Sequence, residues 1–165
     1  MSDCLKSLIS RLEALGAKAS SQHLAQILEA EASSYEVIKK RCEFSESRYT
    51  RKRIAIGEFY ELLLIGWLPG QASTIHDHLD SSCAFRVLSG VATEKLYSLD
   101  TVDPEGIWWA KFQSERDYQP GDICQTASSD DIHRVSNDHS NEPLVTLHIY
   151  SPPIKMRVYQ ERKAV

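Results

Sequence analysis

Apolar side chains recur at three- and four-residue spacing over the first third of the chain, which is the pattern of amphipathic helices that bury one face. The first run consists of Leu5, Leu8, Ile9, Leu12 and Leu15. Gly16 follows this run and is suited to end the helix. Ser20 or Ser21 is suited to cap a second helix, whose apolar face comprises Leu24, Ile27 and Leu28. We expect a short third helix over about residues 33–40.

After Tyr49 the pattern changes to short segments rich in Val, Ile, Leu, Trp and Tyr, and these segments are separated by residues typical of turns. These segments read FYELLLIGWL, CAFRVLSG, VATEKLYSL, GIWWAKFQ, DICQT, IHRVS, PLVTLHIY and IKMRVYQ. Many short strands at such spacing predict a β-sandwich or barrel. No linker-like stretch separates the helices from the strands. We therefore expect one mainly β domain over residues 1–165, with a helical part at 1–45 packed against a β-barrel at 46–165.

Composition narrows the class of protein. A chain of 165 residues can bury a core without disulfides, and a net charge of −4 gives no basic surface for nucleic acid or an anionic membrane. No apolar run is long enough to span a bilayer, and charges interrupt the apolar residues near the N-terminus, unlike in a signal peptide. We expect a cytoplasmic monomer with reduced cysteines and with no nucleic-acid or membrane partner.

Two histidines one residue apart are the first sign of chemistry. His76 and His78 lie in the segment STIHDHLDSSC, residues 73–83. On a strand, both side chains point to one face and lie about 7 Å apart at the backbone, with Asp77 on the other face. Such a pair can bind a transition metal together with a third ligand, although the spacing also occurs by chance.

The third ligand must come from the remaining histidines. His23 falls in a predicted helix and His139 in a polar turn, and we expect both at the surface. His133 lies in the strand-like segment DIHRVSN, and His148 lies deep in the apolar segment LVTLHIY. These two are the candidates for an interior site, and His148 also fits a hydrogen-bonded core position.

The flanks of the histidines resemble a known superfamily. The flanking residues are Gly70, Cys83 and Gly90 around the first segment, and Pro120, Gly121 and Asn137 around the second. Their spacing resembles the two motifs of the cupins, which are small double-sheet β-barrels of the jelly-roll kind. In many cupins a Glu completes a set of three His and one Glu, and Cys83 stands at that position here. The resemblance therefore implies that His76, His78 and His133 bind the metal.

Such a ligand set affects the choice of substrate. Three neutral imidazoles leave a divalent metal with a net charge of about +2, against about +1 for two histidines and one carboxylate. The site then favours an anionic ligand, and a thiolate is suited because a bound metal deprotonates a coordinating thiol.

Four segments extend the resemblance to the thiol dioxygenases, and specifically to the cysteine dioxygenase family. They are RYTR at 48–51, STIHDHLDSSC at 73–83, IHRVSN at 132–137 and LHIYSPP at 147–153. The family uses a mononuclear non-haem Fe(II) to insert both atoms of O2 into the sulfur of L-cysteine, giving cysteine sulfinic acid. The resemblance implies the same activity here, with the substrate thiolate bound to iron.

The resemblance also implies a substrate site. Arg51 matches the arginine that binds the substrate carboxylate, a role that suits the paired hydrogen bonds of a guanidinium, and Tyr49 matches a tyrosine beside it. Without the resemblance, Arg51 reads as a surface arginine and Tyr49 as a core aromatic. Tyr150 matches a tyrosine close to the iron, and His148 matches a histidine that hydrogen-bonds it. Strand alternation agrees, since it puts Thr146, His148 and Tyr150 on one face.

Cys83 has an expected role of its own. In animal-type members of the family, the cysteine equivalent to Cys83 is joined by a thioether to the tyrosine equivalent to Tyr150, whereas many bacterial members have glycine there. The resemblance implies a Cys83–Tyr150 thioether as a protein-derived cofactor. The alternative is a buried free cysteine that only packs. The resemblance also suggests a cis bond between Ser151 and Pro152.

Two further functions stay open. A dioxygenase of another small thiol acid, such as 3-mercaptopropionate or mercaptosuccinate, fits the same metal site. Arg51 favours cysteine, but Arg157, which stands where animal members carry a small cysteine, is a candidate partner for a second carboxylate. A non-catalytic cupin that binds a metal or a ligand is the other reading. The pair His148 and Tyr150 discriminates against it, because a site that only holds a metal does not need this pair.

Overall fold

A computed structural model describes residues 3–31, 35–126, 131–138 and 141–162. His139, which the sequence places in an exposed turn, lies outside these ranges. Within them, the helices are α1 (Asp3–Glu13), α2 (Ser21–Ala30) and α3 (Tyr35–Lys39). The strands that follow are β1 (Thr50–Ile56), β2 (Glu61–Trp67), β3 (Ile75–Asp77), β4 (Ser82–Ser89), β5 (Ala92–Val102), β6 (Trp108–Tyr118), β7 (Ile123–Gln125), β8 (Ile132–Ser136), β9 (Leu144–Ser151) and β10 (Arg157–Glu161).

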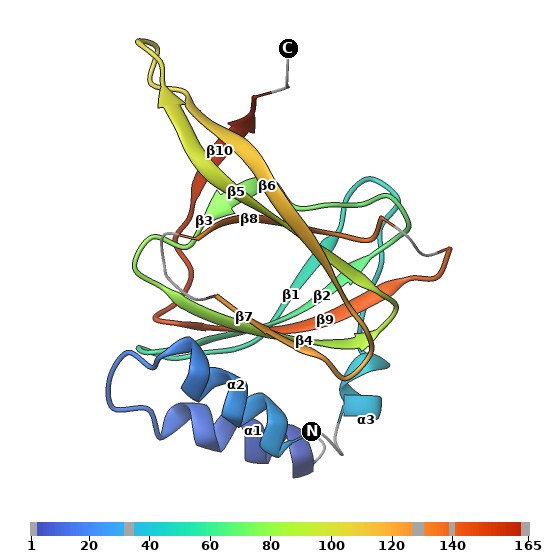
Figure 1. Cartoon of the computed structure of the whole chain (residues 1–165). Helices are drawn as coiled ribbons and strands as arrows, with labels where there is room; N and C mark the ends of the chain where they lie inside the picture. The colour runs from blue at the N-terminus through green and yellow to red at the C-terminus, as the bar shows by residue number, and fades with distance from the viewer. Residues whose placement is uncertain (1–2, 32–34, 127–130, 139–140, 163–165) are drawn as a thin grey trace.

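One sheet has the strand order β1-β2-β9-β4-β7, and α1 and α2 lie against its outer face (Figure 1). β9 is at its centre and pairs antiparallel with both β2 and β4. Every residue of β2 and β9 is buried. Both faces of these strands are covered, which explains why their sequences read as nearly continuous apolar runs.

The other strands form a small closed barrel of order β10-β3-β8-β5-β6. β10 closes the barrel, because it pairs antiparallel with β3 and parallel with β6. The long strands β5 and β6 continue beyond the barrel as an arm that projects from the top of the molecule (Figure 1).

The two sheets and the helices enclose three separate apolar clusters. The cluster between the helices and the first sheet includes Leu8, Leu24, Leu28, Leu62, Leu147 and Ile149. The cluster between the sheets includes Leu63, Ile65, Phe85, Val135 and Tyr150. A small third cluster comprises Ile75, Tyr97, Ala110, Ile132 and Tyr159. Neighbours along β9 divide between the first two clusters, as the period of two in a strand requires.

The predicted elements agree with this architecture, except that β1 and the short β3 are not among the predicted strand segments. Ser20 caps α2, since its Oγ accepts a hydrogen bond from the His23 amide at 3.2 Å. The mainly β fold and the cis Ser151–Pro152 bond are confirmed. β1 was not predicted, because its charged sequence TRKRIAI exposes alternate residues at the sheet edge and so lacks an apolar run.

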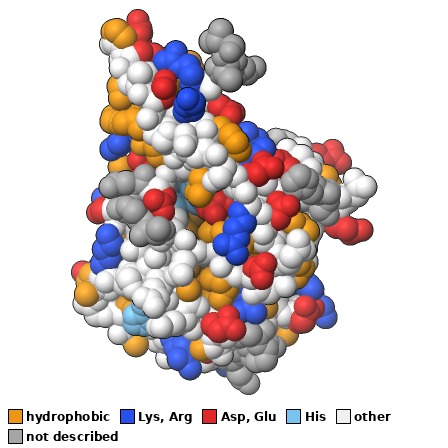
Figure 2. Space-filling view, in the orientation of Figure 1, with side chains coloured by type: hydrophobic (Ala, Val, Ile, Leu, Met, Phe, Trp, Pro, Cys, Tyr) orange, Lys and Arg blue, Asp and Glu red, His pale blue; other side chains and the backbone are white. Residues whose placement is uncertain are grey.

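The surface in the view of Figure 2 carries intermixed acidic and basic side chains, with apolar groups along the projecting arm. The exposed apolar residues of β5 and β6 are Leu96, Leu99, Val102 and Phe112. No helix among the described residues is long and apolar enough to cross a membrane.

Candidate metal centre

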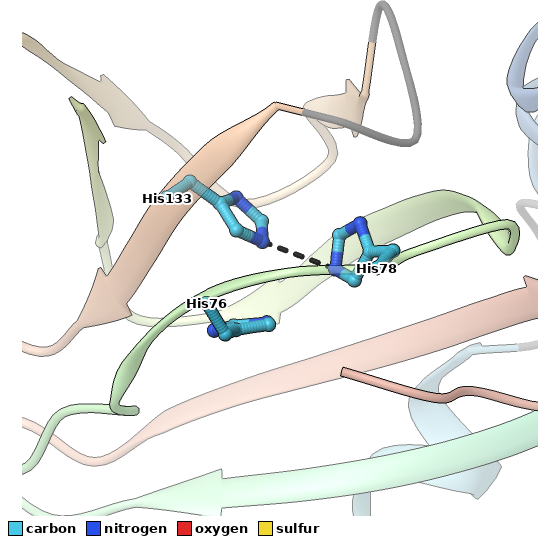
Figure 3. A group of neighbouring side chains, drawn as sticks. All are labelled: His76, His78 and His133. Atoms are coloured by element: carbon cyan, nitrogen blue, oxygen red, sulfur yellow. Dashed lines mark hydrogen bonds between the residues drawn. The ribbon is translucent and has the colours of Figure 1, made fainter. Parts of the chain in front are cut away.

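Three histidines converge between the two sheets (Figure 3). His76 lies on β3 directly opposite His133 on β8, and His78 directly follows the last residue of β3. Their candidate ligand nitrogens all lie within 4.8 Å of one another, and the Nε2 atoms of His78 and His133 are 3.2 Å apart. All three side chains are buried, with at most 6% of their surface exposed.

The strand assignment ends just before His78. β3 ends at Asp77, and the turn that follows begins at His78, whose carbonyl accepts a hydrogen bond from the Ser81 amide at 2.9 Å. The rings of His76 and His78 lie 5.1 Å apart between their centroids. Asp77 anchors this turn, because its Oδ1 accepts hydrogen bonds from the amides of Leu79 and Arg157 at 3.1 and 3.2 Å. The two histidines converge as the sequence predicts.

The three imidazoles differ in what Nδ1 contacts. His76 Nδ1 donates to the Thr74 carbonyl at 2.9 Å, and His133 Nδ1 lies 2.7 Å from a carboxylate oxygen of Glu94. Both acceptors hold the ring proton on Nδ1, which leaves the Nε2 lone pair directed at the centre. His78 Nδ1 is buried and has no hydrogen-bond partner among the described residues.

Burial favours the neutral form of His76 and His78. It lowers the pKa of His76 from 6.5 to about 3, and the neighbouring charge of His133 lowers it further. Burial, with His133 and His76 beside it, also lowers the pKa of His78. A metal binds the neutral ring. Three buried imidazoles whose candidate ligand nitrogens lie within 4.8 Å of one another therefore fit a transition metal.

The described residues add no carboxylate or thiol to this ligand group. A set of three protein ligands leaves coordination positions open for small molecules, as catalytic metal sites require. The expectation that Cys83 is not a ligand is consistent with this arrangement.

A pocket opens beside His76 and His133, and the residues expected to bind substrate line it. Arg51 on β1 is exposed and lines the pocket, and no ion-pair partner for it occurs among the described residues. Tyr49 lines the same pocket and stacks on Trp67, with ring centroids 4.5 Å apart. An unpaired cation at this place is suited to an anionic group on a ligand.

A chain of hydrogen bonds runs along the inner face of β9. Trp67 Nε1 donates to Thr146 Oγ1 at 2.9 Å, and Thr146 Oγ1 lies 2.9 Å from His148 Nε2. His148 Nδ1 in turn lies 3.2 Å from the Tyr150 hydroxyl. The indole can only donate, so the threonine hydroxyl proton is available to His148 Nε2. The ring proton then sits on Nδ1 and faces the Tyr150 oxygen, so the phenol does not donate its proton to His148.

Both titratable members of this chain are neutral. Burial lowers the pKa of His148 well below its ordinary value, and the charge of Arg51 lowers it further. Burial raises the pKa of Tyr150 well above its ordinary value, and Cys83 raises it further. The phenol is therefore a hydrogen-bond donor throughout the physiological range.

Cys83 and Tyr150 are direct cross-strand partners on β4 and β9. Residues paired in this way have Cβ atoms about 4.5–5.5 Å apart. Both side chains are buried, and burial raises the pKa of the Cys83 thiol while a hydrogen bond with Tyr150 lowers it in part.

Arg157 is not part of the pocket. Its guanidinium stacks on Trp108 at 4.1 Å from the ring centroid, and its Nη1 lies 3.8 Å from Asp77 Oδ2. Arg157 thus supports the turn that carries His78, and gives no support to a second carboxylate site.

The sequence did not predict the residues that hydrogen-bond the site residues and hold them in place. Glu94 on β5 is only 6% exposed and holds His133, and Trp67 anchors the chain of hydrogen bonds on β9. A signal for Glu94 exists in the sequence, since alternation in the strand VATEKLYSL puts this carboxylate on the face of Ala92. A charged residue on a buried face requires a partner.

The chain is similar to known proteins in both sequence and structure. The family model described as "Cysteine dioxygenase type I" matches residues 3–162. Cysteine dioxygenase type 1 of Rattus norvegicus is 34% identical over 133 residues, which are 80% of this chain and 65% of the rat protein. The protein of the same name from Danio rerio is 31% identical over 143 residues, or 86% of this chain and 70% of its own length. The chain thus spans about two thirds of the length of these relatives.

Solved structures show the same fold at low identity. The protein TT1209 from Thermus thermophilus aligns with a TM-score of 0.56 and 20% identity, covering 70% of this chain and 93% of that one. A Klebsiella pneumoniae protein with a double-stranded β-helix domain aligns with a TM-score of 0.55 and 18% identity, covering 74% and 94%. These likenesses support the cupin-type barrel that the sequence motifs predict.

Proposed function

This chain belongs to the cysteine dioxygenase type I family, and from that premise we propose that it oxidises L-cysteine with O2 to cysteine sulfinic acid at Fe(II) held by His76, His78 and His133. Both oxygen atoms enter the product, so that R–SH and O2 give R–SO2H without another reactant. One observation carries the proposal. His76 and His133, two members of the buried group of three histidines, line a pocket that has an unpaired arginine in its wall.

Iron supplies the redox chemistry between the thiol sulfur and O2 when it is bound. The protein holds it through three neutral ligands, which leaves positions free for small molecules and a positive charge that favours a thiolate. Burial of the histidines excludes bulk water from the ligand nitrogens.

Arg51 binds the substrate carboxylate in this proposal. Its guanidinium has no competing carboxylate among the described residues, and it lines the same pocket as His76 and His133. A carboxylate on Arg51 and a thiolate at the metal fix a small amino acid at both ends, so that the sulfur is oriented before it reacts. Tyr49, stacked on Trp67, forms part of the wall beside Arg51.

Tyr150 presents its hydroxyl proton to the reacting groups. His148 orients this hydroxyl and is itself oriented by Thr146 and Trp67. The raised pKa of Tyr150 keeps the proton on the phenol, so the residue donates a hydrogen bond and does not carry a negative charge. A donor fixed in this way is suited to stabilise charge that develops on sulfur or oxygen.

The Cys83–Tyr150 pair forms a thioether cofactor in the same proposal. Formation removes one hydrogen from the thiol and one from the phenol ring, and O2 accepts both. The cross-strand pairing and the burial of both side chains support the link. Its effect is to fix the phenol in one orientation.

The competing functions gain no support from the site. A dioxygenase of mercaptosuccinate needs a partner for a second carboxylate, and Arg157 is engaged with Trp108 and Asp77 outside the pocket. A cupin that only binds a metal has no use for the ordered His148–Tyr150 pair.

Oxygen uptake by the iron-loaded protein tests the proposal. Addition of L-cysteine should start O2 consumption at a ratio of one O2 per cysteine, and 18O2 should add two labelled atoms to the sulfinate product. 3-Mercaptopropionate should react more slowly, because it lacks the amino group of cysteine, and the His133→Ala variant should be inactive. Faster turnover of 3-mercaptopropionate would assign the enzyme to another thiol acid, and no uptake with either thiol would contradict the proposal.

A further inference from the structure

Glu94 is a buried carboxylate that the proposed reaction does not use directly. It lies on β5, and 6% of its surface is exposed. Its Oε1 is 2.7 Å from His133 Nδ1. Its Oε2 accepts hydrogen bonds from the Tyr118 hydroxyl at 3.0 Å and from the Cys124 thiol at 3.3 Å. All its named partners are donors, so this environment is built for an ionised carboxylate.

The three candidate ligand histidines differ in the hydrogen-bond partner of Nδ1. His133 has an anion at Nδ1 and His76 has a neutral carbonyl there, whereas Nδ1 of His78 has no hydrogen-bond partner among the described residues. Partners behind metal ligands fix the tautomer and raise the basicity of the ligand, and a carboxylate does so more strongly than a carbonyl because it carries charge.

We propose that Glu94 is a positioning residue of the metal centre, which aims His133 Nε2 at the metal and supplies one negative charge from outside the ligand set. A divalent metal with three neutral histidines carries about +2, and a carboxylate directly behind one of these ligands brings the buried total to about +1. The centre thereby has the charge of a two-histidine, one-carboxylate site while its coordination position stays free for substrate.

Tyr118 and Cys124 prevent Glu94 from becoming a ligand itself. They occupy Oε2 from β6 and β7, on the side away from His133. Rotation of the carboxylate toward the metal would break both hydrogen bonds and leave two buried donors unpaired. The residue is therefore held as a partner of His133.

The inference rests on the metal centre of the proposed function and not on the identity of the thiol. Its test uses Co(II) alone, bound to metal-free protein in competition with a chromophoric chelator. Glu94→Gln keeps the shape and a carbonyl acceptor for His133 but removes the charge. We expect Co(II) affinity to fall roughly 10- to 100-fold, and the Fe(III)/Fe(II) potential of the iron-loaded variant to rise, since the lost negative charge had favoured the ferric state.

Glu31→Gln is the matched control. Glu31 is also a buried carboxylate, 8% exposed, but it holds Ser7 and Arg11 in the helical part of the chain. Its substitution should lower stability without changing Co(II) affinity or the potential. A structural role for Glu94 alone would likewise leave both quantities unchanged in folded Glu94→Gln protein, and that result would overturn the inference.

A measurement on the wild type keeps the test valid if Glu94→Gln does not fold. In Zn(II)-loaded protein labelled with 15N, the His133 ring should be coordinated through Nε2 and protonated at Nδ1, with that proton protected from exchange. Coordination through Nδ1 would exclude Glu94 as its partner. Wild-type protein that binds Co(II) but consumes no O2 would contradict the proposed reaction and leave the role of Glu94 standing.

Discussion

Single residues decide whether the metal centre works, because each imidazole must be neutral and correctly turned. Burial lowers the pKa of His76 to about 3, so a metal does not have to displace a proton from it at neutral pH. The hydrogen bonds of Thr74 and Glu94 settle which ring nitrogen faces inward. The same logic applies to Tyr150, whose hydroxyl is oriented by His148. Substitutions at this scale should therefore separate metal binding from substrate binding.

Arg51→Ala should retain iron and lose affinity for L-cysteine. Removal of a charge-assisted hydrogen-bonded pair costs about 1.5–3 kcal/mol, which corresponds to a roughly 10- to 150-fold higher KM. Iron content and steady-state oxygen uptake measure the two effects. Arg48→Ala is the control, since it removes a nearby exposed arginine that does not line the pocket. If the wild type oxidised cysteamine, which lacks the carboxylate, as well as cysteine, the role of Arg51 would be wrong.

Protein aged with iron, cysteine and air should accumulate the Cys83–Tyr150 thioether. Peptide mass spectrometry should find the two peptides linked and lighter by two hydrogens, with the linked fraction rising with turnover. Peptides containing Cys42 should stay unlinked and serve as an internal control. We expect Cys83→Gly to be slower but active and Tyr150→Phe to be impaired more. Fully active protein with a persistently free Cys83 thiol would mean that the cysteine only packs.

At the scale of elements, β9 joins the structural core to the site. Leu147 and Ile149 face the helices, whereas His148 and Tyr150 face the pocket. The period of two in a strand makes this division possible within four consecutive residues. β9 is also central in its sheet, so neighbours on both sides fix the position of His148 and Tyr150. Substitutions on the face of β9 that packs against the helices should therefore affect the free energy of unfolding more than the activity.

Leu24→Ala in α2 should lower the free energy of unfolding by about 2–5 kcal/mol, because it opens a cavity in the fully buried contact of α2 with the sheet. Co(II) affinity at 25 °C should not change, since the sheet separates Leu24 from the histidines. Urea denaturation followed by circular dichroism measures the loss, with the exposed Gln26→Ala as control. We propose that helices and barrel form one domain, so a single transition is expected; two transitions would indicate that the helices unfold separately.

At the scale of the whole molecule, the metal centre is a group of buried histidines that the unfolded chain would expose. Burial lowers the pKa values of His76, His78 and His148 in the folded protein. Below the ordinary value of 6.5 the unfolded chain therefore binds more protons than the folded one. Stability should be complete above this pH and fall as the pH is lowered toward 3, where His76 titrates in the folded state.

Metal-free protein should show this dependence between pH 7.5 and 5.5. The slope is up to about 1.4 kcal/mol per pH unit for each histidine that only the unfolded chain protonates. Urea unfolding at several pH values measures it. The double variant His76→Gln, His78→Gln should flatten the curve, whereas His23→Gln, at an exposed position of α2, should not. Equal stability of the metal-free wild type across this range would contradict the predicted neutrality of the buried histidines.

The sequence by itself predicted the fold class and the three candidate ligand histidines. Apolar periodicity predicted the helices and most strands, because buried faces leave a direct record in the pattern. The resemblance of the motifs around His76, His78 and His133 to those of a known superfamily implied the metal site, since ligands must be particular residue types at fixed spacing. The alternation along β9 predicted that Thr146, His148 and Tyr150 share one face.

Only the tertiary structure decided what surrounds those residues. Glu94 reaches His133 across β5 and β8, Trp67 reaches Thr146 across β2 and β9, and Arg157 turns away to Trp108. The first two contacts join positions that are 39 and 79 residues apart, and no local pattern encodes the register that brings them together. The edge strand β1 could not be predicted for a related reason. Its charged sequence has no apolar run that indicates a strand, and it forms a strand because it pairs with β2. Side-chain spacing within one strand can be read from the chain, whereas neighbours on different strands are fixed by pairing and packing of the whole fold.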